Sequence, residues 1–159
     1  MFENEYFKHL IEKTLDELYK EEPELFVLDD SKKIKKHVGE RAIVFRFGLY
    51  FQKELDEHEW SKEYKLDCEY NRNGADPKKI PTVGNRIYPD LILHKRNNND
   101  GNLVVMEFKG WWNQNQEYDE KKIEKMVDKN GKFCYHAGYT ILLGKNRAEA
   151  NVNPILQKS

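Results

Sequence analysis

The stretch that decides the fold is RIYPDLILHKRNNNDGNLVVMEFK, residues 86–109. It contains two apolar runs, RIYPDLILH and NLVVMEFK, joined by KRNNNDG, a run of turn-forming residues that favours an antiparallel hairpin. Apolar residues occupy both faces of the two runs, which is typical of central strands that are covered on two sides. A strand with one face in water would alternate apolar and polar residues instead. The stretch therefore predicts the middle of a sheet.

The geometry of this hairpin brings charged residues together. A hairpin symmetric about Asn98 and Asn99 places Asp90 directly opposite Glu107. Directly opposed residues have Cβ atoms about 4.5–5.5 Å apart. Lys109 lies two positions after Glu107, so its side chain shares the same face of the strand. The sequence therefore predicts that two carboxylates and one ammonium group converge on one face of the sheet.

Two helices are predicted before the hairpin. Residues 4–20 place apolar side chains at helical spacing among Glu and Lys, and the pattern ends before Pro23. Residues 39–55 carry a second apolar stripe, which includes Val44. Glu40 lies one turn before Val44 on the same stripe, so we expect its carboxylate to point toward the sheet.

The remaining segments complete a mixed sheet. Alternation in residues 64–72 predicts a strand, and the Gly-, Asn- and Pro-rich residues 71–85 predict a loop. Residues 115–129 predict a charged helix with one apolar face, and the apolar run at 138–144 predicts a buried final strand. The order helix, helix, three strands, helix, strand indicates an α/β fold. Its mixed sheet would be flanked by helices, with residues 1–30 as an N-terminal helical cover.

The composition is that of one water-soluble domain. A chain of 159 residues has the length of one ordinary domain, and 38% hydrophobic residues with 13% aromatics suffice for one core. We find no run of about 18 apolar residues and no signal-peptide pattern in MFENEYFKHL, so we expect a cytoplasmic protein with no membrane partner. Cys68 and Cys134 lack zinc-site spacing and are expected to be free thiols.

The opposed carboxylates predict a metal site. Two carboxylates between largely apolar strands repel each other and lose hydration, and a hard divalent cation compensates for both effects. Mg²⁺ is the natural candidate, with Mn²⁺ as a substitute. Lys109 could orient an attacking water or offset negative charge in the transition state, and Glu40 could complete the coordination shell. The alternative is a buried ion pair between Lys109 and one of the two carboxylates.

A family resemblance rests on three elements of the sequence, which follow one another in the order Glu40, Pro89-Asp90 and Glu107-Phe108-Lys109. Set in the order αβββαβ, they resemble the PD-(D/E)XK nuclease superfamily, whose members include restriction endonucleases and Holliday-junction resolvases. The likeness covers about residues 38–145. It is nearest to small nuclease-like proteins that combine EYNR, here residues 69–72, with PDLILHKR and NLVVMEFK.

The resemblance implies a fold and a set of roles. It implies a restriction-endonuclease-like core with an extra N-terminal helix. Mg²⁺ would be bound by Asp90, Glu107 and the backbone carbonyl of Phe108. Lys109 would be the catalytic lysine, and Glu40 would match the acidic residue of the first core helix.

Four further residues are candidates for contacts with nucleic acid: Trp111, Trp112, Arg72 and Lys122. A tryptophan ring directly after the site could stack on a base, or it could pack as core or lid. Arg72 could contact a phosphate or remain a solvated loop residue. Lys122 lies near the start of the helix that follows the site strand, where a polar residue often assists the site in the superfamily. The net charge of −1 counts against a nucleic-acid binder, although lysines are clustered locally.

Three functions are consistent with the sequence. The first is a metal-dependent nuclease that hydrolyses DNA phosphodiester bonds by a metal-activated water. The second is a non-catalytic nucleic-acid-binding or regulatory module on the same scaffold, because function resides in the site and not in the fold. The third is a structural protein with a buried ion-pair cluster. A homodimer is expected only if both strands of a duplex are cut. The sequence does not distinguish DNA from RNA or duplex from single strands.

Overall fold

The computed structural model describes residues 4–27, 38–73, 76–80, 86–113 and 117–156. Its three α-helices are α1 (Asn4–Glu21), α2 (Glu40–Asp56) and α3 (Glu117–Val127). Its strands are β1 (Lys65–Cys68), β2 (Arg72–Asn73), β3 (Asp76–Pro77), β4 (Leu91–His94), β5 (Asn102–Gly110), β6 (Ala137–Leu143) and β7 (Asn151–Ile155). Short 3₁₀ helices lie at Pro23–Leu25, Glu59–Glu63 and Arg147–Glu149. No helix of the described part is long and apolar enough to span a bilayer.

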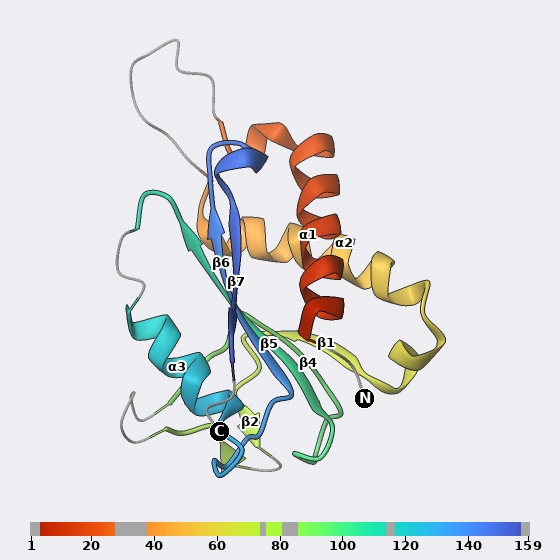
Figure 1. The fold of residues 1–159 in the computed structure, drawn as a ribbon, viewed down its shortest axis with the longest axis vertical. Coiled ribbons are helices and arrows are strands. Elements are labelled where there is room, and N and C mark those ends of the chain that lie inside the picture. The colour runs from red at the N-terminus through yellow and green to blue at the C-terminus, as the bar shows by residue number, and fades with distance from the viewer. Residues whose placement is uncertain (1–3, 28–37, 74–75, 81–85, 114–116, 157–159) are drawn as a thin grey trace.

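Five of the strands form one mixed sheet in the order β1-β4-β5-β6-β7 (Figure 1). The β5–β6 pair is parallel, and the other three pairs are antiparallel. Parallel neighbours need a long crossover connection, and α3 supplies it between β5 and β6. The expected α/β class with a mixed sheet is therefore confirmed.

The hairpin register agrees with the sequence pattern. Leu91 pairs with Met106 and Leu93 pairs with Val104, and the register shifts only at His94. Continued by one residue, this register sets Asp90 opposite Glu107, as predicted. Because β4 begins at Leu91, β5 extends past the first residue of β4 from Glu107 onward. This end of the sheet leaves room for side chains from elsewhere in the fold.

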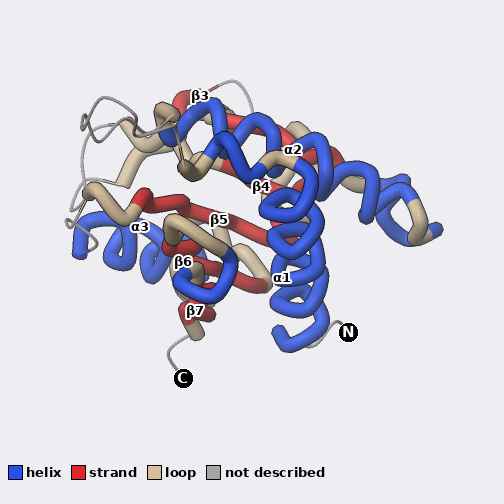
Figure 2. Tube along the Cα trace, turned by 90° about the horizontal axis from the view of Figure 1, so that it is seen from above, coloured by secondary structure: helices blue, strands red, loops and turns tan. Residues whose placement is uncertain are grey.

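The sheet separates two cores. Helices α1 and α2 cover one face, and α3 covers the other (Figure 2). The α1/α2 face receives Val104, Met106 and Phe108 from β5, and the α3 face receives Val105. A Cβ atom on Gly138 of β6 would come within 2.3 Å of a methyl group of Ile123, so α3 packs directly on the sheet backbone here. Val105, Glu107 and Lys109 of β5 face α3.

Several elements differ from the predicted ones. The first strand ends at Cys68 and not at residue 72, because Glu69 adopts a positive φ of 49°. The predicted loop 71–85 contains the two-stranded ribbon β2–β3, and the basic segment 31–37 lies outside the described residues. Strand β7 was not predicted. Its Pro154 is unusual in a strand and is tolerated because β7 lies at the sheet edge.

Candidate active site

Four structural elements bring a group of charged side chains to the end of β5. Asp90 precedes β4, and Glu107 and Lys109 belong to β5. The Asp90 carboxylate accepts a hydrogen bond of 2.7 Å from the backbone N–H of Phe108, which holds it beside the strand. Glu107 is 3% exposed. The two carboxylates that the sequence sets opposite each other therefore lie on the α3 face, at the point where β4 ends.

The lysine pairs come from α3. Lys109 Nζ lies 2.5 Å from Asp119 Oδ2, and Lys122 Nζ lies 2.6 Å from Glu107 Oε2. Lys122 also lies 4.0 Å from Asp119 Oδ1 and 3.4 Å from the backbone carbonyl of Tyr88. The predicted alternative paired Lys109 with Asp90 or Glu107. The structure shows an ion pair of Lys109, but its partner is Asp119. The lysine that neutralises Glu107 is Lys122.

Glu40 reaches the same region from the opposite face of the sheet. It is the first residue of α2, and its Oε2 accepts a hydrogen bond of 2.8 Å from the backbone N–H of Gly110, the last residue of β5. The side chain thus reaches the sheet, as its place on the helical stripe predicts. Its charge acts on both Asp90 and Lys109. One carboxylate oxygen is used for the backbone contact, which leaves the other for a second partner.

The cluster carries more negative than positive charge. Its carboxylates are Glu40, Asp90, Glu107 and Asp119, and its ammonium groups are Lys109 and Lys122. With every group ionised, the balance is two negative charges. Glu107 Oε1 is buried and has no hydrogen-bond partner among the described residues. A buried carboxylate oxygen without a partner is costly, so the cluster has the donor set that a cation would satisfy.

Burial changes the protonation of the two central carboxyls. Burial is the main cause that raises the pKa of Asp90, to about 6. Burial and the neighbouring Asp90 raise the pKa of Glu107 well above its usual value. Partial burial by itself lowers the pKa of Lys109, but the bonded Asp119 outweighs it, so that this pKa is raised. Both central carboxyls therefore bind a proton more readily than ordinary carboxyls do.

The carboxylates of the cluster fit one particular way of binding Mg²⁺. The described part of the chain contains no group of three or more His, Cys, Asp or Glu side chains arranged to hold a metal. Mg²⁺ does not require such a group, because it usually binds through one or two carboxylates, several waters and the phosphate of a substrate. Asp90 and Glu107 supply two carboxylates. Their use would require Lys122 to release Glu107 Oε2, since that oxygen is already paired.

The four residues predicted to contact nucleic acid lie in different parts of the structure. Trp111 and Trp112 pack edge to face, with ring centroids 4.4 Å apart, and both pack half-buried against the α1/α2 core. Their main contacts are thus with the protein. Lys122 is 6% exposed and pairs with Glu107 in the buried cluster. Arg72 is exposed and lines a pocket beside the cluster.

Asp119 was missed by the sequence reasoning. It lies on the stripe of α3 that also carries Lys122, Ile123 and Met126, and all four side chains are buried. An Asp-x-x-Lys pair within an apolar helical stripe is a detectable signal, because a charged residue on a buried face needs a partner there. The helix was predicted, but the stripe was assigned only from its apolar members.

Comparisons with protein-family models, with curated proteins and with solved structures found no match for this chain. The assignment of a function therefore rests on the residues of the cluster.

Proposed function

We propose that the protein is a metal-dependent nuclease that hydrolyses DNA phosphodiester bonds, with a core of the PD-(D/E)XK type. The observation that carries the proposal is the pair Asp90 and Glu107 beside Lys109, at the end of β5 where β4 is absent. The excess of two negative charges and the unpartnered Glu107 Oε1 support a cation requirement. The αβββαβ order within the mixed sheet agrees with the resemblance.

Each residue of the cluster has a role in this proposal. Asp90, Glu107 and the carbonyl of Phe108 would hold Mg²⁺, and Mn²⁺ would substitute for it. The ion supplies Lewis-acid stabilisation of the phosphodiester and lowers the pKa of a bound water. Lys109 orients the attacking water and offsets negative charge on the phosphate. Its ammonium group is half-buried, and the low local dielectric strengthens its electrostatic interaction with that charge.

Three residues act on the others. Asp119 holds the Lys109 ammonium group at 2.5 Å and therefore positions it. Lys122 neutralises Glu107 and would compete with a cation for the same carboxylate. Glu40 adds negative charge from α2 and would contribute to the coordination shell of the ion.

The test is calorimetric titration of Mg²⁺ together with cleavage of plasmid and single-stranded DNA in the same buffer. Wild type is expected to bind Mg²⁺ and to cleave. Glu107→Gln is expected to lose binding and at least about 100-fold of the cleavage rate, because it removes a direct ligand and not only a neighbour of one. Glu120→Gln is the matched control, since Glu120 is exposed on α3 next to Asp119.

A non-catalytic nucleic-acid-binding or regulatory module is the second candidate. The observation that favours it is the ion pair of Lys122 with Glu107, which already neutralises one of the two central carboxylates. This candidate predicts DNA binding that is independent of Mg²⁺ and no cleavage by wild type. A chain that binds neither Mg²⁺ nor DNA would leave a structural ion-pair cluster as the only role of these residues.

A further inference from the structure

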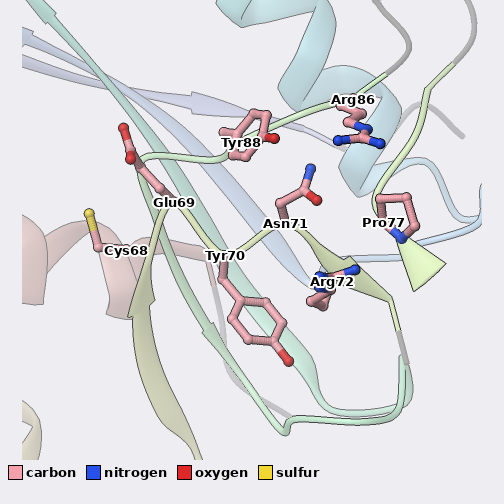
Figure 3. Close-up of a pocket in the computed structure, with 8 residues that line it drawn as sticks. All are labelled: Cys68, Glu69, Tyr70, Asn71, Arg72, Pro77, Arg86 and Tyr88. Atoms are coloured by element: carbon pink, nitrogen blue, oxygen red, sulfur yellow. The ribbon is translucent and has the colours of Figure 1, made fainter. Parts of the chain in front are cut away.

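A pocket lies next to the cluster and has no role in the chemistry described above. Its volume is about 510 Å³, within the range of about 300–1,000 Å³ that is usual for small-ligand sites. Its lining includes Glu69, Tyr70, Asn71, Arg72, Arg86 and Tyr88. Figure 3 shows Asn71, Arg86 and Tyr88 along one part of the pocket, with the Tyr70 ring directed away from them.

The wall of the pocket is firmly held. The Asn71 side chain donates a hydrogen bond of 2.9 Å to the carbonyl of Ile87. The backbone carbonyl of Asn71 accepts one of 2.9 Å from the backbone N–H of Lys78. Lys78 is only 2% exposed, and its ammonium group donates to the carbonyl of Arg72 at 2.5 Å. Burial lowers the pKa of Lys78 to about 8, which shows how much hydration the group gives up. A buried lysine thus ties β2 to β3 and fixes the backbone of Arg72.

The groups that face the pocket suit a nucleotide. Arg72 and Arg86 are exposed and positively charged, which suits phosphate oxygens. Tyr88 is 49% exposed and offers a ring face to a base. Glu69 would repel a phosphate, but its carboxylate lies 3.0 Å from the guanidinium of Arg41, which offsets the charge. The pocket therefore combines cationic and aromatic contacts.

The pocket shares its wall with the candidate active site. The backbone N–H of Glu69 donates to the carbonyl of Asp90 at 3.2 Å. The carbonyl of Tyr88 lies 3.4 Å from Lys122 Nζ, which in turn lies 2.6 Å from Glu107. A strand with its phosphate at Asp90 and Glu107 would thus place its neighbouring nucleotide at Tyr88. The first turn of α2 also contacts both places, through Glu40 and Arg41.

We propose that this pocket holds one unpaired nucleotide next to the scissile phosphate, so that the substrate is a DNA strand with a single-stranded or extruded nucleotide at the cleavage site. This inference rests on the proposed nuclease function. A concave pocket with a half-exposed ring accepts a base only after the base has left the duplex stack. Intact duplex would contact the arginines through phosphates but would leave the pocket without a base.

Binding can be measured without cleavage. A fluorescein-labelled duplex with a single-stranded overhang is titrated in Ca²⁺, and the anisotropy is compared with that of the blunt duplex of the same sequence. Wild type is expected to bind the overhang more tightly, by about tenfold, as one stacked base contributes. Tyr88→Ala is expected to remove this preference, and Tyr88→Phe is expected to keep it because the ring remains. Arg72→Ala and Arg86→Ala are expected to weaken binding to both DNAs.

Matched controls distinguish an effect of the pocket from effects of overall charge and of folding. Arg147→Ala removes an arginine that pairs with Asp16 on α1, away from the pocket, and is expected to bind as wild type does. The Tm of Tyr88→Ala is expected to be within about 2 °C of wild type, because the half-exposed ring adds little to the core. Tyr88→Leu provides a second variant without an aromatic face, should Tyr88→Ala unfold.

The outcomes distinguish the two proposals. Tyr88-dependent preference for the overhang in Glu107→Gln, with or without cleavage by wild type, supports the pocket even where the nuclease proposal fails. Cleavage by wild type that is equal on blunt and overhanging DNA and is unchanged in Tyr88→Ala would overturn the pocket while the nuclease proposal stands. Equal binding of both DNAs by wild type would also overturn it.

Discussion

Strand β4 carries a cluster of buried charge at each end, and the two clusters differ in how they are neutralised. At its last residue, His94 Nε2 lies 2.8 Å from Asp67 Oδ2, and Arg96 bonds both oxygens of the same carboxylate. At its start, Asp90 lies among three other carboxylates and two lysines. Each cluster combines residues at one end of β4 with a carboxylate from another element, Asp67 from β1 and Asp119 from α3.

The protonation of the carboxyls shows the contrast most clearly. Burial acts to raise the pKa of Asp67, but the bonds from Arg96 and His94 outweigh it and the pKa is lowered. Burial raises the pKa of Asp90 to about 6 because no such donors outweigh it. A cluster whose carboxylate is fully bonded stabilises the fold by itself. In the other cluster the carboxyls keep raised pKa values, and groups with such perturbed pKa values are typical of functional sites.

The largest expected effect comes from Lys109, in the cluster with surplus carboxylates. Lys109→Met is expected to lower the turnover number about 100-fold, because the half-buried ammonium group acts on charge that develops in the transition state. The Mg²⁺ affinity should stay within about threefold of wild type, as no ligand is lost. Arg96→Met is the matched change at the other cluster and should leave turnover unchanged. Equal losses of turnover in both variants would contradict a functional difference between the two clusters.

The pH dependence of stability is expected to have opposite signs at the two clusters. The folded protein binds a proton at Asp90 more tightly than the unfolded chain does, so the free energy of unfolding rises as pH falls from about 6 to 4. The rise is of the order of 2–3 kcal/mol. The lowered pKa of Asp67 gives stability above about pH 4 that is lost as pH falls further.

Urea denaturation across this pH range measures both trends in the metal-free protein. Asp90→Asn should reduce the rise between about pH 6 and 4, since Glu107 contributes the remaining part with the same sign. Mg²⁺ affinity should fall below about pH 6, because the ion needs the deprotonated carboxylate. A flat profile in both wild type and variant would contradict the burial of Asp90.

Neutralising one carboxylate in each cluster sharpens the comparison further. Asp67→Asn should lower the free energy of unfolding by about 2 kcal/mol, because charged hydrogen bonds to Arg96 and His94 are lost. Glu107→Gln should change this free energy less, because the loss of the ion pair with Lys122 is offset by relief of the repulsion from Asp90 and Asp119. Thermal and urea unfolding of the two variants provide the measurement, and similar losses in both would contradict it.

The smallest expected effect is that of Glu40→Gln. The amide oxygen still accepts the hydrogen bond of Gly110, so the fold is retained and only the charge is lost. Mg²⁺ affinity is expected to fall about tenfold, as for a group outside the direct ligands. Titration calorimetry against wild type measures this change. A loss as large as that of Glu107→Gln would instead make Glu40 a direct ligand.

Much of the fold followed from local patterns, and the errors have local causes as well. Helices α1 and α2 were predicted because their apolar periodicity is long and regular. The hairpin and β6 were predicted because their apolar runs are bounded by turn-forming residues or by glycines. Strand β7 was missed since NVNPI contains a proline and offers one buried residue, Val152, to the pattern. The ribbon β2–β3 was missed because two-residue strands have no periodicity to detect.

The sequence by itself determined which residues share a face. The turn centre fixes the hairpin register and thus the pair Asp90 and Glu107, the strand period adds Lys109, and the helical period adds Glu40. Only the tertiary structure decided which charges meet. Asp119 and Lys122 come from α3, whose place depends on close packing over Gly138 and not on any pattern within the hairpin. Periodicity gives the direction of a side chain, whereas its partner depends on distances between elements far apart in the chain.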